Sequence, residues 1–417
     1  MKNLVTLAAA MLVTGALAYP QISEQRVVQD AQKRLEVSYA LNEPAVVVAD
    51  ILVDGSPIPA SHRSTFRGDV DQLVPAGRHA FTWKPYKEGF EGVRLDDVSV
   101  AIRAYSVSRP PDYMAVDIEP PCAVRYYESA DRVPGGVTND AYKTATMLFR
   151  LVPAANVEWV MGCTAYESGV DNAAIAAREV PHRVTLSEDY YIGVYPVTQG
   201  QYYWMTGERP SGFRNRTDRD LRPVENVAYQ TLRGVSSAGW LGWPQEGHDV
   251  LEGSVLHAFR TRTGIQFDLP TDAQWEYAAR AGARTIFYTG EATAESLMTI
   301  AWCAQNSYDE QGGQNETHAV GTKIPNAWGL YDVLGNVLEM CLDVHGNMTS
   351  AAAVDPVGPA AAANSPRLVR GGCYSSVAST SAASLHDCSL ALRNICGYDS
   401  GSNDRGFRLV CPATAVK

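Results

Sequence analysis

The chain has 417 residues, of which 46% are hydrophobic and 19% are charged. This composition predicts a globular protein with a sizeable core and room for two or three domains. The formal net charge is −11 and the basic residues do not gather in any one stretch, so nucleic acid and anionic membrane surfaces are not expected partners.

The first residues have the pattern of an export signal. Lys2 supplies a positive charge, residues 4–15 form an apolar run, and Ala16-Leu17-Ala18 is a small-residue cleavage site. We therefore expect a signal peptide over residues 1–18 and a protein that is secreted, periplasmic or held at the cell surface. The apolar run is shorter than the roughly 20 residues that span a bilayer, and no later segment reaches that length. No membrane span is expected.

Cysteine and histidine patterns do not identify a metal site. No Cys-x-x-Cys spacing occurs, so a zinc or thioredoxin-like motif has little support, whereas export would permit disulfides. The histidines at 257, 318, 345 and 386 are scattered, and each is interpreted as a packed or solvated side chain. The eight cysteines are Cys122, Cys163, Cys303, Cys341, Cys373, Cys388, Cys396 and Cys411.

Residues 19–108 are predicted to form an all-β, sandwich-like domain. Segments that alternate apolar and polar residues, such as 34–41 and 98–105, are separated by turn clusters such as Asp54-Gly-Ser-Pro. Residues 109–143 contain two Pro-Pro pairs that disfavour helix, and they are predicted to be a linker or docking segment.

The stretch from Trp328 to Asp343 fits neither a helical nor a strand period. Asp332 and Glu339 flank Gly335, which permits a tight bend, so the loop could fold carboxylates and carbonyl oxygens around a hard cation such as Ca²⁺. A turn capped by Asp332 and followed by a buried strand explains the same pattern. The spacing leaves both interpretations open.

The segment from Leu269 to Gly282 predicts a well-capped helix. Thr271 and Gln274 have the spacing of a capping box, Asp272 favours the positive end of a helix, and Gly282 is suited to its C-terminus.

Taken together, these segments resemble the formylglycine-generating enzyme family, also called sulfatase-modifying factors. Residues 328–340 are similar to its Gly-Leu-Tyr-Asp-Met-x-Gly-Asn-Val-Trp-Glu-Trp signature. The resemblance implies an α+β fold of the C-type-lectin-like kind, with much irregular chain, over residues 144–412. The other matching segments are Glu179–Leu186, Tyr191–Tyr202, Leu269–Gly282, Ala301–Ser307, Arg367–Tyr374 and Gly406–Val410.

The resemblance also implies structural calcium. At the first site the implied ligands are the side chains of Asp332 and Glu339 and the carbonyls of Gly335 and Val337. At a second site they are Asn306 and Ser307, with further ligands in residues 308–317.

The resemblance does not extend to the catalytic cysteines. Family enzymes convert a cysteine within Cys-x-Pro-x-Arg of a sulfatase to formylglycine, using dioxygen and a copper ion held by two cysteines. Those positions are Ser376 and Ser381 here, and a neutral hydroxyl is a poor ligand for Cu(I). Copper oxidase activity is therefore not expected. Cys373 and Cys388 lie nearby in sequence. They could form a structural disulfide, or they could act as a reactive dithiol in place of the missing cysteines.

Three hypotheses follow. The protein is a family member without the oxidase that binds a peptide, a glycan, a sulfatase or another exported protein. Alternatively, it is an active formylglycine-generating oxidase with a non-standard site at Cys373 and Cys388. In the third hypothesis, it is an extracellular structural or interaction protein whose β-sandwich makes the contacts.

Overall fold

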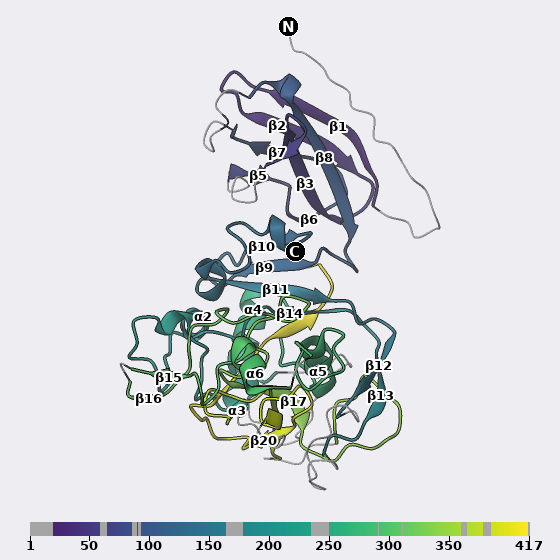
Figure 1. Ribbon diagram of the computed structural model, residues 1–417. Helices are drawn as coiled ribbons and strands as arrows, with labels where there is room; N and C mark the ends of the chain where they lie inside the picture. The colour runs from purple at the N-terminus through teal and green to yellow at the C-terminus, as the bar shows by residue number, and fades with distance from the viewer. Residues whose placement is uncertain are drawn as a thin grey trace. The chain divides into compact units, whose positions relative to one another are not determined.

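The structure is a computed structural model of the chain (Figure 1). It describes residues 20–58, 65–85, 90, 93–163, 178–234, 250–290, 292–310, 312–359, 365–377 and 385–415. The predicted signal peptide and Ser381 lie outside these residues. Within these ranges, no helix combines the length and the apolar character that crossing a membrane requires.

The chain forms two compact units. One contains residues 1–115, 123–139 and 413–417, and the other contains residues 116–122 and 140–412. The segment 109–143, which we expected to be a linker or docking segment, is divided between the units and carries regular structure of its own. It contains β9 (Tyr113–Asp117), β10 (Val124–Tyr127) and the 3-10 helices η4 (Ala130–Arg132) and η5 (Asp140–Lys143).

The first unit contains two β-sheets with apolar side chains between them, as predicted. One sheet has the strand order β1-β2-β7-β5; the other has the order β4-β3-β6, with β8 also paired to β3. Leu35, Val37, Tyr39 and Leu41 alternate with more exposed residues in β2 and enter the core. The strands are β1 (Ile22–Gln29), β2 (Leu35–Leu41), β3 (Ala45–Val53), β4 (Ser56–Pro57), β5 (Arg67–Gly68), β6 (Gln72–Val74), β7 (Gly77–Trp83) and β8 (Val98–Ser106), and η3 (Leu95–Asp97) precedes β8.

The second unit is an α+β fold in which short elements are joined by long irregular segments. Its helices are α2 (Gln199–Thr206), η6 (Arg219–Leu221), α3 (Tyr229–Arg233), α4 (Val255–Thr263), α5 (Asp272–Arg280) and α6 (Ala294–Ile300). Its strands are β11 (Thr146–Val152), β12 (Val157–Met161), β13 (His182–Leu186), β14 (Tyr190–Gly193), β15 (Tyr308–Asp309), β16 (Gln314–Asn315), β17 (Leu338–Val344), β18 (Ala353–Val354), β19 (Arg367–Arg370), β20 (Asn394–Cys396), β21 (Arg405–Gly406) and β22 (Val410–Pro412).

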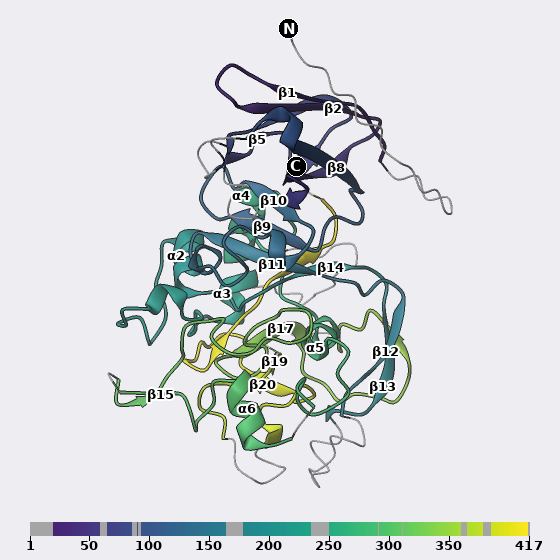
Figure 2. The same cartoon turned by 45° about the horizontal axis from the view of Figure 1, so that its top comes forward.

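Small sheets bring distant segments of this unit together. β14 pairs with β11 and with β22, so the end of the unit returns to its beginning. A second sheet has the order β12-β13-β18. A third has the order β20-β19-β17-β21, with α5 beside β17 (Figure 2). The chain leaves this third sheet through Gly371 and Gly372, directly after β19.

Helix α5 has the predicted N-terminal capping box, whereas its left-handed C-cap is Ala281, one residue before the predicted Gly282. Thr271 accepts a hydrogen bond from the Gln274 backbone N–H at 3.1 Å, and the Gln274 side chain accepts one from the Thr271 N–H at 2.9 Å. The helix ends at Arg280, and Ala281 and Gly282 follow with φ of 45° and 91°. Glycine suits the second position because left-handed backbone costs it little.

We predict that Thr271→Ala destabilises the unit by about 1 kcal/mol, because the N–H of Gln274 loses its acceptor at the helix start. The midpoint of urea unfolding measures this change. Thr271→Ser is the matched control and should retain most of the stability, since it keeps the hydroxyl. An equal loss in both variants would assign the effect to the buried methyl group instead.

Candidate functional site

The chain makes a tight turn after β19, in the segment where the resemblance placed the first of the two catalytic positions, Ser376. The Ser376 Oγ accepts a hydrogen bond from the Cys373 N–H at 3.1 Å, and the Ser376 N–H donates to the Cys373 carbonyl at 3.0 Å. The Ser376 carbonyl accepts a hydrogen bond from the Ala304 N–H at 2.9 Å, which connects the turn to the segment after α6. Gly372 has a φ of 74°, and a Cβ there would lie 2.6 Å from the Cys388 sulfur.

Three thiols gather around this turn. Cys373 Sγ lies 3.2 Å from Ser375 Oγ and 3.7 Å from Ser376 Oγ. Cys388 interacts electrostatically with Cys303 and Cys373, and it has a hydrogen bond with Ser376. Sequence reasoning named Cys373 and Cys388 but missed Cys303, because nothing in the sequence indicated that the segment after α6 meets the β19 turn.

The environment of these thiols is poor for thiolate chemistry. Cys303 and Cys388 are fully buried, and burial raises the pKa of both thiols, that of Cys388 well above its ordinary value. A protonated thiol is neither a good nucleophile nor a good metal ligand. Cys373 and Cys388 are not joined in this structure, and the Cys373–Cys388 disulfide stays a prediction.

Aromatic and apolar side chains lie next to the turn. The Tyr374 ring packs edge to face against Phe213, with 5.4 Å between the ring centroids. The Tyr374 carbonyl accepts a hydrogen bond from the Ser307 hydroxyl at 2.7 Å. Tyr308, which follows Ser307, is 60% exposed, and Val377 is 47% exposed. Exposed aromatic and apolar groups beside a structured turn are typical of a surface that binds another molecule.

At the first predicted calcium loop, the carboxylates of Asp332 and Glu339 both accept hydrogen bonds from other groups of the protein. Glu339 is fully buried, accepts from Trp275 Nε1 at 2.7 Å, and forms an ion pair with Arg408 Nη2 at 2.7 Å. Asp332 accepts from the Gly321 N–H at 2.7 Å and from Asn336 Nδ2 at 3.3 Å. Burial raises the pKa of Asp332, against the lowering effect of these donors and of Arg408.

The backbone of this loop shows why its glycine is needed. Gly335 has a φ of 75°, and a Cβ there would lie 2.4 Å from the Trp302 carbonyl oxygen. The same carbonyl accepts a hydrogen bond from the Asn336 N–H at 2.8 Å. The bend that the sequence predicted at Gly335 is therefore present, and it docks on the Trp302 segment. Val337, whose carbonyl is the remaining implied ligand, is buried beside it.

At the second predicted calcium loop, hydrogen-bond donors of the protein also occupy oxygens of the implied ligands. The Asn306 Oδ1 accepts from the Cys303 N–H at 2.8 Å, and the Ser307 carbonyl accepts from His318 Nε2 at 3.0 Å. Among the acidic side chains of this loop, Glu316 forms ion pairs with Arg216 and Arg222. Arg222 also pairs with Asp309 at 3.0 Å.

Arginine therefore compensates the carboxylate charge in both loops. Because Arg408 holds Glu339, this side chain does not fit a calcium ion in the observed arrangement, and Asp332 alone supplies too few oxygens. Calcium at these loops rests on the family resemblance and stays a prediction. The Gly406–Val410 segment contained Arg408, but sequence alone did not indicate that Arg408 reaches Glu339.

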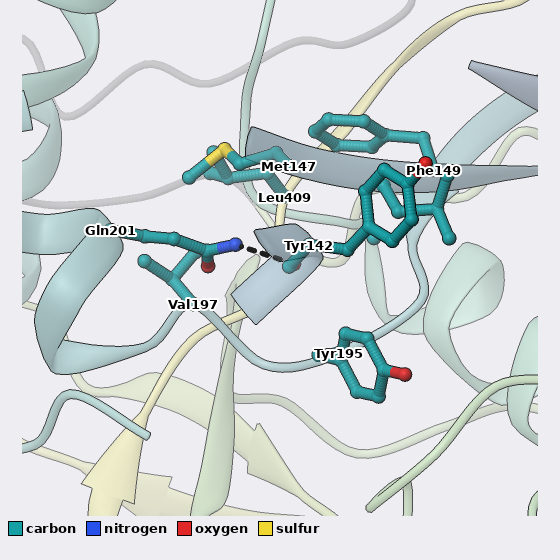
Figure 3. Close-up of a pocket in the computed structure, with 9 residues that line it drawn as sticks. Tyr142, Met147, Phe149, Tyr195, Val197, Gln201 and Leu409 are labelled. Carbon is teal, nitrogen blue, oxygen red and sulfur yellow. Dashed lines mark hydrogen bonds between the residues drawn. The ribbon is translucent and has the colours of Figure 1, made fainter. Parts of the chain in front are cut away.

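A small cavity lies elsewhere in the second unit, between β11, β14 and α2 (Figure 3). It has about 10 Å³ of free volume, enough for roughly one water molecule. Tyr142, Phe149 and Tyr195 are among its lining residues, and Gln201 donates a hydrogen bond to the Tyr142 carbonyl at 3.0 Å. None of the predicted site residues lines it, so it is not a candidate ligand site.

Comparison with known proteins identifies several relatives of this chain. A chaperone protein, LppX, of Paenibacillus barcinonensis is 28% identical over 190 residues, which cover 39% of this chain and 65% of the relative. The formylglycine-generating enzyme of Thermomonospora curvata is 28% identical, with 49% of this chain and 60% of the enzyme covered. Mouse inactive C-alpha-formylglycine-generating enzyme 2 is 25% identical, with 57% and 80% covered.

Among solved structures, Treponema denticola variable protein 1 is similar with a TM-score of 0.49 and 26% identity, covering 64% of this chain and 96% of that protein. The chain spans less than two thirds of the length of the first two relatives above. The family model for the sulfatase-modifying factor enzyme 1-like domain matches residues 151–413, which is more than half of the chain. The chain therefore belongs to the sulfatase-modifying factor family, which includes the formylglycine-generating enzymes and has the C-type-lectin-like fold.

Proposed function

We propose that this protein is an exported member of the family that lacks copper-dependent oxidation and acts by binding a peptide segment of another exported protein. Export is inferred from the leader-like residues 1–18. The observation that carries the proposal is the turn at Ser376, where the family's copper enzymes have a cysteine. There a hydroxyl oxygen accepts a backbone hydrogen bond.

The argument against copper is one of ligand chemistry. Cu(I) is a soft ion that thiolates select, whereas a serine hydroxyl is a hard donor that remains protonated at neutral pH. The nearest alternative sulfurs belong to Cys303, Cys373 and Cys388. Burial keeps the thiols of Cys303 and Cys388 protonated, which disfavours thiolate ligation by this pair.

The argument for binding is the surface beside the turn. Tyr308 and Val377 expose apolar surface, and the Tyr374 ring packs edge to face against Phe213. Tyrosine supplies a large contact area at a small entropic cost, so it is a frequent anchor in interfaces. The names of two relatives also support binding without catalysis, since one is named a chaperone and another an inactive enzyme.

A second candidate function is formylglycine generation through a relocated thiol site. The gathering of Cys303, Cys373 and Cys388 around Ser376 favours it. Burial raises the pKa of the Cys303 and Cys388 thiols, which opposes their deprotonation, so we rank this candidate below binding.

We predict that the purified protein, given Cu(I), dioxygen and a Cys-x-Pro-x-Arg peptide, forms no aldehyde product detectable by mass spectrometry. The control is the double variant Ser376→Cys/Ser381→Cys, which should bind Cu(I) when the wild type does not. Turnover by the wild type that survives Cys373→Ala and Cys388→Ala would refute the ligand argument. Turnover that these changes abolish would establish the second candidate instead.

We predict that Tyr308→Ala weakens binding of a fluorescently labelled Cys-x-Pro-x-Arg peptide about tenfold, because the truncation removes an exposed anchor beside the turn. Fluorescence anisotropy gives the dissociation constants. Ile395→Ala is the matched control, since Ile395 is 46% exposed on β20, and it should not change the affinity. Equal affinities for the two variants would exclude this surface. Binding of a sulfated glycan without binding of the peptide would exclude the peptide class.

We predict that Glu339→Gln lowers the free energy of unfolding by about 3–5 kcal/mol, because Arg408 keeps its buried charge without a counter-charge. Chemical denaturation with and without a calcium chelator measures the change, and we expect the same loss in both conditions. Glu158→Gln is the control: it removes an exposed pair with Arg183 and should cost no more than about 1 kcal/mol. A loss seen only when calcium is present would assign Glu339 to calcium.

A further inference from the structure

Three residues from distant parts of the second unit meet at a place that the family resemblance does not assign. Cys163, Glu179 and His386 bring a sulfur, a carboxylate oxygen and a ring nitrogen to within 4.8 Å of one another. Among the described residues, no other group of at least three cysteine, histidine or acidic side chains meets this distance. Glu179 and His386 are each 1% exposed, and Cys163 is half-buried.

The backbone holds the first two residues together. The Cys163 N–H donates to the Glu179 carbonyl at 2.8 Å. Gly162, with a φ of 97°, makes the close approach possible, since a Cβ there would lie 2.7 Å from the Glu179 carbonyl oxygen. Gly162 is itself held, because its N–H donates to Glu276 Oε1 and its carbonyl accepts from Arg280 Nη2, both at 2.9 Å. The cluster is therefore attached to the ion pairs of helix α5.

The hydrogen bonds within the cluster leave one buried atom unexplained. His386 Nε2 lies 2.8 Å from Glu179 Oε2, and Glu179 Oε1 accepts from the Arg393 N–H at 3.3 Å. The Nδ1 atom of His386 is buried and has no hydrogen-bond partner among the described residues. The ring nitrogen that faces Glu179 is Nε2, so an ion shared by these two residues would bind Nε2 and replace its hydrogen bond to Glu179 Oε2. An ion site here is therefore supported by the convergence of the three ligand atoms and not by Nδ1.

We propose that Cys163, Glu179 and His386 bind one Zn²⁺ ion. Zinc accepts thiolate, imidazole and carboxylate ligands in one tetrahedral site, whereas Ca²⁺ and Mg²⁺ require oxygen ligands and Cu(I) prefers sulfur. A thiolate, a carboxylate and a neutral imidazole balance the charge of the ion. Three protein ligands leave the fourth position to water or another small ligand, and the partial exposure of Cys163 gives the ion access from solvent.

Cobalt substitution tests the site directly in the full-length protein. Co²⁺ bound by a cysteine thiolate produces a charge-transfer absorption in the near ultraviolet. We expect this band to saturate at one equivalent of Co²⁺ and to disappear when Zn²⁺ is added. Cys163→Ser should remove the band, and Glu179→Gln and His386→Gln should each weaken Co²⁺ binding at least about tenfold. Cys396→Ser and His257→Gln are the matched controls and should bind Co²⁺ like the wild type.

A second measurement uses the wild-type protein alone and does not depend on variants that fold. Zn²⁺ should slow alkylation of Cys163 by iodoacetamide at least about tenfold, as mapped by mass spectrometry, because a metal-bound sulfur is a poorer nucleophile than a free thiolate. A wild type that gives no cobalt–thiolate band would overturn the proposal. So would a band that persists in Cys163→Ser, or alkylation of Cys163 that Zn²⁺ does not slow.

Discussion

The second unit depends on arginine side chains that are buried against carboxylates. Arg408 pairs with Glu339, Arg370 pairs with Glu276 and Asp272, and Arg233 pairs with Asp268, and all of these groups are almost fully buried. Removing one partner of such a pair leaves an uncompensated charge in the interior, which costs far more than the loss of an exposed pair. Because this unit has short strands joined by irregular chain, these pairs supply cross-links that regular structure does not.

The same pairs position the candidate sites. Arg370 is the last residue of β19, and its ion pairs with α5 fix the point from which the chain enters the Ser376 turn. Arg393 pairs with Asp272 at 2.7 Å through its side chain, while its backbone N–H donates to Glu179. Asp272 also lies near Asp343, and burial together with this neighbouring carboxylate raises the pKa of Asp343 to about 7. One network of charges thus connects helix α5, the turn and the Cys163 cluster.

Local signals in the sequence predicted local structure well. The capping box at Thr271, the bend at Gly335 and the alternation in residues 34–41 each act within a few residues of the chain, and each is present. Partners that come from distant segments could not be predicted in this way. Nothing in the loop of Glu339 showed that Arg408 would reach this carboxylate. His386 looked isolated because Glu179 lies 207 positions away.

The absence of copper chemistry that we propose is compatible with an intact turn at Ser376, because a fold does not depend on the activity of its site. At this position the copper enzymes of the family need a sulfur that points toward a metal, whereas the turn itself needs only an acceptor for the Cys373 N–H. A hydroxyl oxygen is a better acceptor for a backbone N–H than a thiol sulfur is. Serine therefore satisfies the structural requirement of the turn while removing the soft donor. The arginine pairs that hold β19 and α5 do not involve this side chain, so the substitution leaves the surface that we propose for binding supported by the same ion pairs.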